Sequence, residues 1–289
     1  MFAITAITGQ VGGAVARHLL TSGQGVRGVM RNPYKAHVWA KRGCEIVIAD
    51  MNDANALSNA FSGVEGVFIL LPPIFDPSPG FPEARQTIAA IRKALESTRP
   101  LKVVCLSTIG ADSPRPNLLN QLGILEQELK TISMPIAFLR AAWFMENSAW
   151  DITSSVEKGI IPSFLQPLDK PVPMVATEDV GRVAAELLQQ EWDGKRIINL
   201  EGRHRISPRD IAASFSKILG KAVKAEEVPR DTWQYLFESQ GMNNPEPRIQ
   251  MLDGFNQGWI EFNDTDTESC IGHSTFDSVL ERMIRETGH

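Results

Sequence analysis

The chain has 289 residues, of which 43% are hydrophobic and 22% are charged, a composition typical of globular proteins that bury one large core or two modest ones. Its 29 basic and 34 acidic residues leave a net charge of −5 and form no basic block. This balance argues against nucleic acid or an anionic membrane surface as the main partner.

The three cysteines, Cys44, Cys105 and Cys270, form no Cys-x-x-Cys pair and lie in or beside apolar segments. This pattern predicts buried thiols in a reducing compartment rather than a zinc site or a disulfide, so no metal is expected. The first residues lack a basic leader, and no apolar stretch reaches the length of a membrane span. We therefore expect a cytoplasmic protein.

Strands and helices alternate along the first half of the chain. Residues 2–7 form an apolar run that predicts a buried strand, and residues 13–21 repeat apolar positions at helical spacing before Ser22 and Gly23 stop the helix. The same patterns predict further strands at residues 25–33, 44–53, 64–73, 100–110 and 135–147, and helices at 34–43, 54–63, 83–98 and 118–132. This alternation predicts an α/β fold of the Rossmann type, with a doubly wound parallel sheet covered on both faces.

The alternation weakens after about Asn147. Residues 174–188 predict a turn and a helix that rejoins the main layer, whereas residues 206–220 and 274–286 predict separate amphipathic helices, the first capped by Ser207 before Pro208. We expect an NAD(P)-binding Rossmann domain made of residues 1–150 and 175–203. A smaller, mainly helical domain of residues 151–174 and 204–289 should bind the substrate in the cleft between the two.

A cluster of small residues separates the first strand from the first helix. In the spacing GxxGxxG, the three glycine positions hold Ala6, Gly9 and Gly12. Such loops let the backbone approach a pyrophosphate while helix amides face its charge, although a close strand-to-helix packing turn has the same composition. The methyl group of Ala6 either crowds this turn or is tolerated with a negative φ.

The end of the second strand favours NADP(H) over NAD(H). A carboxylate there would bind the ribose of NAD, but the sequence offers Arg31, with Lys35 one short turn later. A guanidinium can form paired hydrogen bonds with a phosphate, although both cations also suit a solvated turn. Asp50 ends the third strand and either lies beside the adenine or caps the next turn, and Pro72 ends the fourth strand, where the nicotinamide half is expected.

Several segments together resemble the NmrA-like family of atypical short-chain dehydrogenases/reductases, closest to its NADPH:quinone oxidoreductase type 2 group. They are ITGQVGGAVARHLL, VMRNPYKA, VFILLPP, VVCLSTIGA and FLRAAWFMEN, followed by VATEDVGRVAAELL, ISPRDIAASFSKILGKAV and IGHSTFDSVL. The resemblance implies a Rossmann domain, a small C-terminal domain and NADP(H) along the carboxyl ends of the strands. It also implies that Arg31 binds the 2′-phosphate, that Pro72 lies beside the nicotinamide, and that the phosphate loop consists of Gly9, Gln10, Val11 and Gly12.

The chain departs from this pattern at two positions. Relatives usually have glycine where Ala6 stands, and they often carry lysine or histidine four residues before the helix glutamate that matches Glu126, where this chain has Leu122. Leucine can neither steady a nicotinamide nor donate a proton. The Tyr-x-x-x-Lys motif of ordinary short-chain dehydrogenases is also missing, because Val38 and Ser239 stand four residues after the two tyrosines.

Candidate catalytic and substrate residues follow the fifth and sixth strands. Ser107 could bond the nicotinamide or a substrate carbonyl, or only satisfy nearby groups. Trp143 and Phe144 offer flat apolar faces to a planar substrate, or pack in the core, and Asn147 offers an amide that makes it a second weak catalytic candidate. We expect Arg140 and Asp179 to form an internal ion pair.

Two functions fit these observations. The first is an NADPH-dependent reductase of quinones or similar planar acceptors, with direct hydride transfer, because such acceptors need binding and orientation more than a strong acid. The alternative is a non-catalytic NADP(H)-dependent redox sensor that binds a regulatory protein partner, which Ala6 and Leu122 motivate. A homodimer is compatible with either function.

Overall fold

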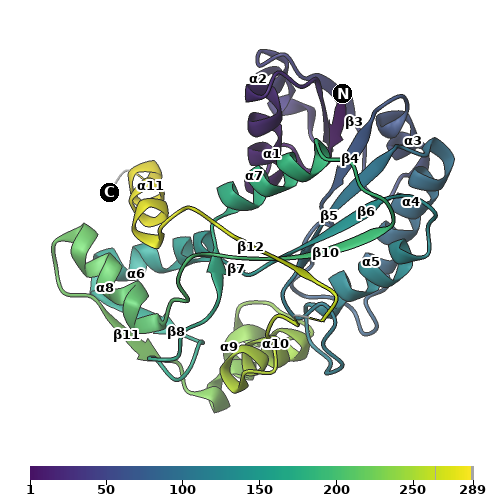
Figure 1. Cartoon of the computed structure of the whole chain (residues 1–289). Helices are drawn as coiled ribbons and strands as arrows, with labels where there is room; N and C mark the ends of the chain where they lie inside the picture. Colours follow the sequence, from purple (N-terminus) through teal and green to yellow (C-terminus); the bar gives the residue numbers. More distant parts are fainter. Residues whose placement is uncertain (264, 288–289) are drawn as a thin grey trace.

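A parallel sheet of eight strands forms the centre of the molecule (Figure 1). The computed structural model describes residues 1–263 and 265–287. All neighbouring strands of the large sheet are parallel. In spatial order they are β12 (Glu268–Ile271), β10 (Lys195–Glu201), β6 (Ile136–Ala141), β5 (Lys102–Thr108), β4 (Gly66–Ile69), β1 (Phe2–Ile4), β2 (Val26–Met30) and β3 (Glu45–Ile48).

The strand order reverses between β1 and β4. From β1 the chain moves outward through β2 and β3, returns to place β4 on the other side of β1, and then continues through β5, β6, β10 and β12. In open α/β sheets, ligands bind beyond the carboxyl ends of the strands at such a reversal. The predicted doubly wound parallel sheet is therefore confirmed, and its topology points to the ends of β1 and β4.

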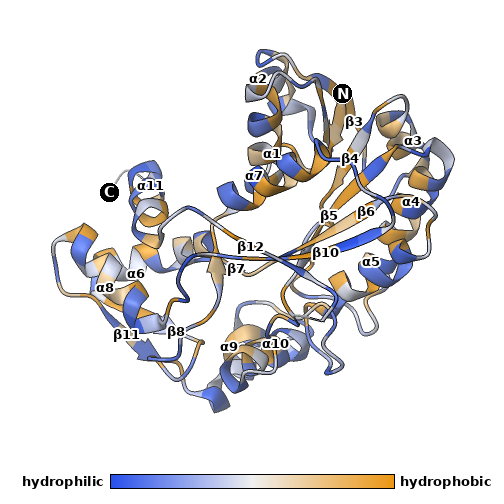
Figure 2. Cartoon of the chain, in the orientation of Figure 1, coloured by the Kyte–Doolittle hydropathy of each residue, from blue (hydrophilic) through white to orange (hydrophobic). Residues whose placement is uncertain are grey.

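Helices cover both faces of the sheet, and successive residues of each strand pack against the helices of opposite faces. Phe2 and Ile4 share a core with α1, α2 and α7, whereas Ala3 shares a core with α3, α4 and α5. Figure 2 shows apolar colour on α1 and α7, and blue in part of β10. Strand β10 begins with the charged residues Lys195 and Arg196. The six helices are α1 (Gln10–Thr21), α2 (Ala36–Ala40), α3 (Ala54–Phe61), α4 (Pro82–Thr98), α5 (Asn120–Lys130) and α7 (Thr177–Leu188).

Helices α1 and α7 pack closely because small residues meet at their crossing. A Cβ added to Gly181 would overlap the Cβ of Ala14 and lie 2.8 Å from its carbonyl carbon. Next to this contact, Arg17 Nη2 lies 2.6 Å from Glu178 Oε2. The predicted return of residues 174–188 to the main layer is confirmed, and α7 supports the helix that starts at the glycine loop.

The remaining elements form a smaller lobe with its own apolar core, which includes the fully buried Phe215, Trp233 and Phe237. Ser207 caps α8 with the expected proline after it, and Asp210 completes a capping box. Its elements are β7 (Trp143–Phe144), α6 (Ile152–Lys158), β8 (Ile160–Ser163), β9 (Met174–Val175), α8 (Pro208–Leu219), β11 (Lys224–Glu227), α9 (Trp233–Ser239), α10 (Glu246–Gln257), α11 (Phe276–Thr287) and the 3-10 helices η2 (Met145–Asp151) and η3 (Arg230–Thr232). The 3-10 helix η1 (Pro33–Lys35) instead connects β2 to α2 beside the large sheet.

Three sequence expectations need adjustment. The first strand ends at Ile4 rather than at residue 7, because the chain already turns at Ala6 with a φ of +50°. Strands β10 and β12 were not predicted, and β12 belongs to the large sheet although residues 204–289 were assigned to the small domain. The rest of that division into two domains stays a prediction.

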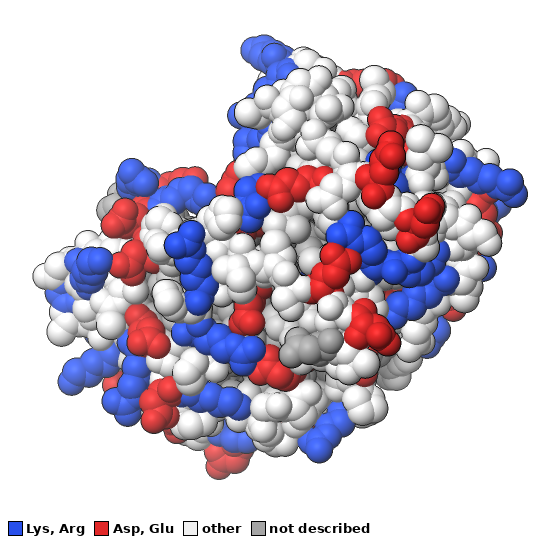
Figure 3. Space-filling model, viewed as in Figure 1, with Lys and Arg blue, Asp and Glu red and all other residues white. Residues whose placement is uncertain are grey.

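The thiols and the surface charges complete the description. Cys44 and Cys105 are buried as expected, Cys270 on β12 is partly exposed, and all three are free. Burial raises the pKa of the Cys105 thiol. The face drawn in Figure 3 mixes cationic and anionic side chains without a broad area of one sign. Within the described residues, no helix has both the length and the apolar character needed to span a bilayer.

Candidate functional site

The loop between β1 and α1 leaves no space for a side chain at Gly12. A Cβ there would overlap the carbonyl oxygen of Ala6 and lie 2.7 Å from that of Thr5. The Thr5 hydroxyl donates to the Phe68 carbonyl at 3.0 Å and so joins β1 to β4 at the start of the loop. Gly9 donates its N–H to the Ala6 carbonyl at 2.9 Å, which closes the turn. The backbone therefore passes directly under the first turn of α1.

The amino end of α1 presents free amide groups. Gly9 is the N-cap and offers no side-chain cap, and the first turn contains no acidic residue. The first intrahelical bond runs from Gly13 N–H to the Gly9 carbonyl at 3.0 Å, and the amides of Gln10, Val11 and Gly12 have no acceptor among the described residues. Such amides and the helix dipole favour an anion at this position, so the loop fits a diphosphate.

Ala6 adopts the conformation that the sequence left undecided. Its φ of +50° lies in the left-handed region, where a Cβ is unfavourable and glycine is not. Of the two alternatives that the sequence left open, tolerance through a negative φ is therefore excluded, and the residue carries the strain of the left-handed conformation. The peptide carbonyl of Ala6 nevertheless bonds Gly9, so the loop keeps its shape with a strained residue in it.

Two exposed cations follow β2, the strand beside β1. Arg31 makes no hydrogen bond or ion pair with any described residue, and Lys35 ends η1. Asn32 accepts a hydrogen bond from the Tyr34 N–H at 2.9 Å and turns the chain between the two cations. Both side chains therefore follow β2, which lies beside β1, the strand that leads into the phosphate loop. Their assignment to the 2′-phosphate stays a prediction.

Asp50 and Pro72 follow strands on either side of β1 and β2. Asp50 accepts the N–H of Asn52 at 2.9 Å, so it caps the turn after β3, and a further contact with adenine stays a prediction. Pro72 is exposed and follows β4 at the point where the strand order reverses. That position is compatible with the predicted contact with nicotinamide.

A buried ionic network lies beside the end of β5. Glu126 and Arg140, each at most 3% exposed, form a bidentate pair with nitrogen to oxygen distances of 2.8 and 2.7 Å. Arg140 also donates to Asp112 Oδ2 at 2.8 Å, and the Ser107 hydroxyl donates to Glu126 Oε1 at 2.6 Å. Burial alone would raise the pKa of Glu126, but bonds from Arg140 and Ser107 and the charge of Lys130 hold that pKa below its ordinary value.

The predicted ion pair between Arg140 and Asp179 is wrong. Arg140 projects to the face of the sheet covered by α5, whereas Asp179 lies on α7 at the opposite face. Asp179 instead accepts the N–H of Ser274 at 2.8 Å, and a Cβ on Gly272 would approach its Oδ2 to 2.9 Å. Asp179 therefore fixes the segment that connects β12 to α11.

The predicted substrate residues lie where the chain leaves the large sheet. Trp143 and Phe144 form β7, and both remain partly exposed. The Trp143 ring meets the Phe255 ring edge to face, with centroids 5.2 Å apart. Asn147 is partly exposed in η2. Phe144 packs against the core between the sheet and α1 and α7, and Trp143 packs against the core of the smaller lobe, so both contribute to core packing. Contact of these two rings or of Asn147 with a substrate stays a prediction.

Glu146 is a buried carboxylate that the sequence reasoning missed. Its oxygens accept the N–H of Thr177 at 3.0 and 3.1 Å and the Thr177 hydroxyl at 2.7 Å, and Arg282 donates to it at 3.0 Å. It therefore caps α7 and connects that helix to α11. No local spacing identifies it, because its partners lie 31 and 136 residues away.

Other catalytic groups are not assembled in the described part of the chain. Tyr34 in η1 and Tyr235 in α9 are 84% and 74% exposed. Residues 1–263 and 265–287 contain no group of three or more metal-binding side chains. The Ser107 hydroxyl donates its proton to Glu126. Its oxygen can therefore still accept a hydrogen bond near the end of β5.

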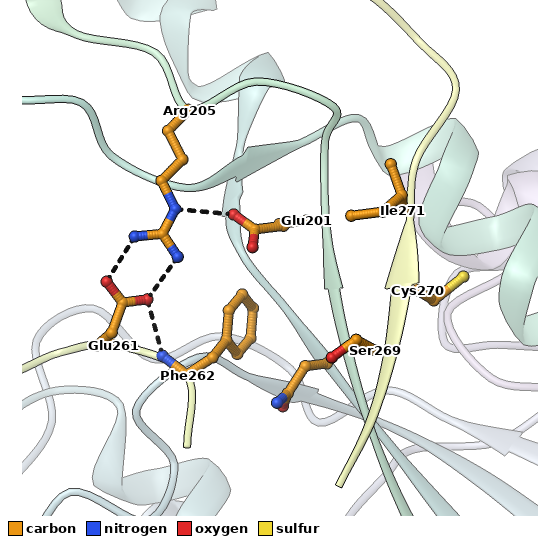
Figure 4. Close-up of a pocket in the computed structure, with 8 residues that line it drawn as sticks. Glu201, Arg205, Glu261, Phe262, Ser269, Cys270 and Ile271 are labelled. Atoms are coloured by element: carbon orange, nitrogen blue, oxygen red, sulfur yellow. Dashed lines mark hydrogen bonds and ion pairs between the residues drawn. The ribbon is translucent and has the colours of Figure 1, made fainter. Parts of the chain in front are cut away.

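One cavity of about 340 Å³ lies at the β10 and β12 edge of the sheet (Figure 4). Figure 4 shows Arg205 between two carboxylates, with distances of 2.7 and 2.9 Å to Glu261 and 3.1 Å to Glu201. Phe262 and Ile271 supply apolar lining. Because β6, β5 and β4 lie between these strands and β1, this cavity is separate from the phosphate loop.

Comparison with known proteins places the chain in a family. The model of the NmrA-like family matches residues 2–261. The chain belongs to the NmrA-like family. Among relatives, quinone oxidoreductase 2 of Escherichia coli is 26% identical over 283 residues, which cover 95% of each chain. The NAD(P)H azoreductase of Xenophilus azovorans is 24% identical over 244 residues, which cover 84% of this chain and 82% of the azoreductase.

Solved structures share the fold of this NmrA-like chain. The structure of NADPH-dependent quinone oxidoreductase from Escherichia coli complexed with NADPH aligns with a TM-score of 0.80 at 21% identity, covering 98% of this chain and all of the other.

At Leu122, the position that departs from the family pattern, the side chain packs against the apolar core beneath α5. Leu122 therefore contributes packing and offers no proton donor.

Proposed function

We propose that this chain is an NADP(H)-dependent oxidoreductase that reduces quinones or similar planar acceptors by direct hydride transfer. The phosphate loop carries the proposal: Gly12 has no room for a Cβ, and three amides at the start of α1 lack acceptors among the described residues. The relatives named as an NADPH-dependent quinone oxidoreductase and an NAD(P)H azoreductase support both the cofactor and the acceptor class. The exposed Arg31 favours NADP(H) over NAD(H).

The residues of the chain would hold the dinucleotide along the carboxyl ends of the strands. In the loop of Gly9, Gln10, Val11 and Gly12, the amides of the last three residues would bind the diphosphate, while Gly9 keeps the turn closed through its bond to Ala6. The Arg31 guanidinium would form paired hydrogen bonds with the 2′-phosphate. Lys35 and Asp50 would lie at the adenosine end. Pro72 and Ser107 would border the nicotinamide, where Ser107, held by Glu126, offers only lone pairs to a carboxamide N–H.

The acceptor would lie between the end of the sheet and the smaller lobe. Trp143 and Phe144 would form flat apolar walls, and the Asn147 amide would donate to an acceptor oxygen. When bound, NADPH supplies a hydride, and one hydride with one proton from water reduces a quinone to a hydroquinone. Because a quinone accepts hydride readily, orientation can supply most of the rate without a tyrosine and lysine pair.

A binding experiment tests the phosphate loop directly. We expect NADPH to bind the wild type, and Gly12→Ala to abolish binding because its Cβ would overlap the Ala6 carbonyl. Gly25→Ala is the matched control, since a Cβ there meets Met1 only at ordinary contact distances of 3.6 to 3.7 Å. Titration with NADPH, monitored by nicotinamide fluorescence, measures the affinity of the wild type and of both variants. Equal binding by wild type and Gly12→Ala would contradict the assignment of the loop.

A panel of quinones and azo dyes tests the reaction. We expect rapid NADPH oxidation with at least one planar acceptor, and slower oxidation with NADH. Tight NADPH binding without turnover of any acceptor would refute the reductase and favour the alternative, a redox sensor that binds a protein partner. Light scattering of the same preparation would determine whether the chain forms a homodimer.

A further inference from the structure

A loop after β4 crosses from the large sheet to the smaller lobe. We call residues 74–77 the strap. Asp76 accepts hydrogen bonds from the N–H of Asn243 at 2.9 Å and of Asn244 at 2.7 Å, and from the Asn243 side-chain amide at 2.9 Å. The two asparagines connect α9 to α10. One carboxylate thus receives both backbone and side-chain donors from a segment 167 residues away along the chain.

The strap is also bound at the positions next to Asp76. Gln121, at the start of α5, donates to the Ile74 carbonyl at 3.0 Å. Asn244 donates its side-chain N–H to the Pro77 carbonyl at 2.8 Å, and Pro77 is buried. The strap therefore has fixed contacts with the Rossmann layer on one side and with the smaller lobe on the other.

Asp76 does not serve the local backbone. The helix that follows, α4, begins at Pro82 after the N-cap Phe81, so Asp76 is not its cap. Among the described residues, all of its side-chain hydrogen bonds run to residues 243 and 244. The bonds from the N–H groups of Asn243 and Asn244 hold the pKa of Asp76 below its ordinary value, because they stabilise the charged carboxylate. Its role is therefore a connection between the two parts of the molecule.

The two segments that Asp76 connects border the proposed reaction site from opposite sides. The strap follows Pro72 and Pro73, where the nicotinamide half of the dinucleotide is expected. Asn244 leads into α10, which lies below β10 in Figure 1 and carries Phe255 against Trp143 at a centroid distance of 5.2 Å. A shift of α10 would therefore move the aromatic wall relative to the end of β4.

We propose that Asp76 is a positioning residue for the reduction. By fixing the connection between α9 and α10 against the strap, it sets the distance between the nicotinamide and the aromatic wall that would bind the acceptor. This inference rests on the proposed function. Hydride transfer requires the reacting atoms in near contact, and a misplacement of about 1 Å from a distant mutation is sufficient to slow a reaction severely. Asp76 itself touches neither reactant in this proposal.

Steady-state kinetics of Asp76 variants test the positioning role. In Asp76→Ala we expect the KM for the quinone to rise on the order of tenfold and kcat to fall, because the acceptor wall is no longer held. The Kd for NADPH should not change, since the phosphate loop and Arg31 lie at the other end of the site. Asp76→Asn keeps one acceptor oxygen and should recover part of the loss. Asp193→Ala, an exposed carboxylate without a partner in the described residues, should behave as wild type.

Hydrogen exchange measures the contact without any reaction. The amides of Asn243 and Asn244 should exchange slowly in the wild type and Asp193→Ala, and quickly in Asp76→Ala. Unchanged exchange in Asp76→Ala would overturn the proposal. Faster exchange with an unchanged KM and kcat would overturn the positioning role and leave the reductase intact. A wild type that binds NADPH but reduces no acceptor would refute the proposed function itself, and with it any role of Asp76 in positioning.

Discussion

Replacing Ala6 with glycine should stabilise the protein. At a φ of +50°, an alanine costs about 1–2 kcal/mol relative to a right-handed conformation. Glycine removes that strain but adds about 0.4–1 kcal/mol of entropy to the unfolded chain. The difference predicts a gain of about 0.5–1 kcal/mol in the free energy of unfolding, or about 1–2 °C in Tm for a chain of this length.

Scanning calorimetry of Ala6→Gly and a matched control checks this reasoning. Ala36→Gly makes the same substitution at a φ of −58°, so it should lower the Tm, because glycine in a helical conformation costs up to about 1 kcal/mol. Ala6→Gly should also keep or improve the affinity for NADPH, measured by fluorescence titration. A lower Tm for Ala6→Gly would refute the strain argument. A large loss of NADPH affinity would mean that the methyl group is a useful contact.

Three further predictions concern charged residues. Arg31→Asp should raise the Kd for NADPH about ten- to a hundredfold, since a bond to a charged group contributes about 1.5–3 kcal/mol, and should change the Kd for NADH little; equal losses in fluorescence titrations would contradict the 2′-phosphate role. Burial raises the pKa of Asp151 from 3.8 to about 7, so between these pH values the folded protein keeps a proton that the unfolded chain loses. The free energy of unfolding should therefore fall by up to about 4 kcal/mol as the pH rises from about 4 to about 7. Urea unfolding of Asp151→Asn should lack that fall; the same pH dependence in both proteins would refute it. Arg140→Met should lose about 3–5 kcal/mol because it leaves Glu126 charged and buried, and adding Glu126→Leu should restore most of this; a double variant no more stable than Arg140→Met would contradict the pairing.

Local patterns were sufficient to predict six of the eight strands of the large sheet and the helices that cover it. Ser207 followed by Pro208 specifies the start of a helix through its own hydrogen bonds, and α8 begins there. The alternation of apolar strands and amphipathic helices likewise predicts the parallel sheet. In contrast, β12 contains only four residues, and three of them are exposed, so its sequence carries little of the apolar signal that marks a buried strand.

The site was less predictable because its contacts join distant residues. Arg140 needed a carboxylate, but choosing Glu126 over Asp179 depends on which face of the sheet each helix covers. The φ of Ala6 is a property of the folded turn and not of the residue type. Asp76 carries no local signal at all, since its partners lie 167 and 168 residues away.

The last described residues also have a consequence for the order in which the protein can fold during synthesis. Glu146 and Asp179 receive hydrogen bonds from Arg282 and Ser274, and β12 is the final strand of the large sheet. A ribosome therefore releases the partners of these two carboxylates only after residues 274 and 282 have emerged, well after the carboxylates themselves. Until then α7 lacks the contact that ties its amino end to α11. A nascent chain paused before residue 268 would expose the β10 edge to chaperones or to other chains.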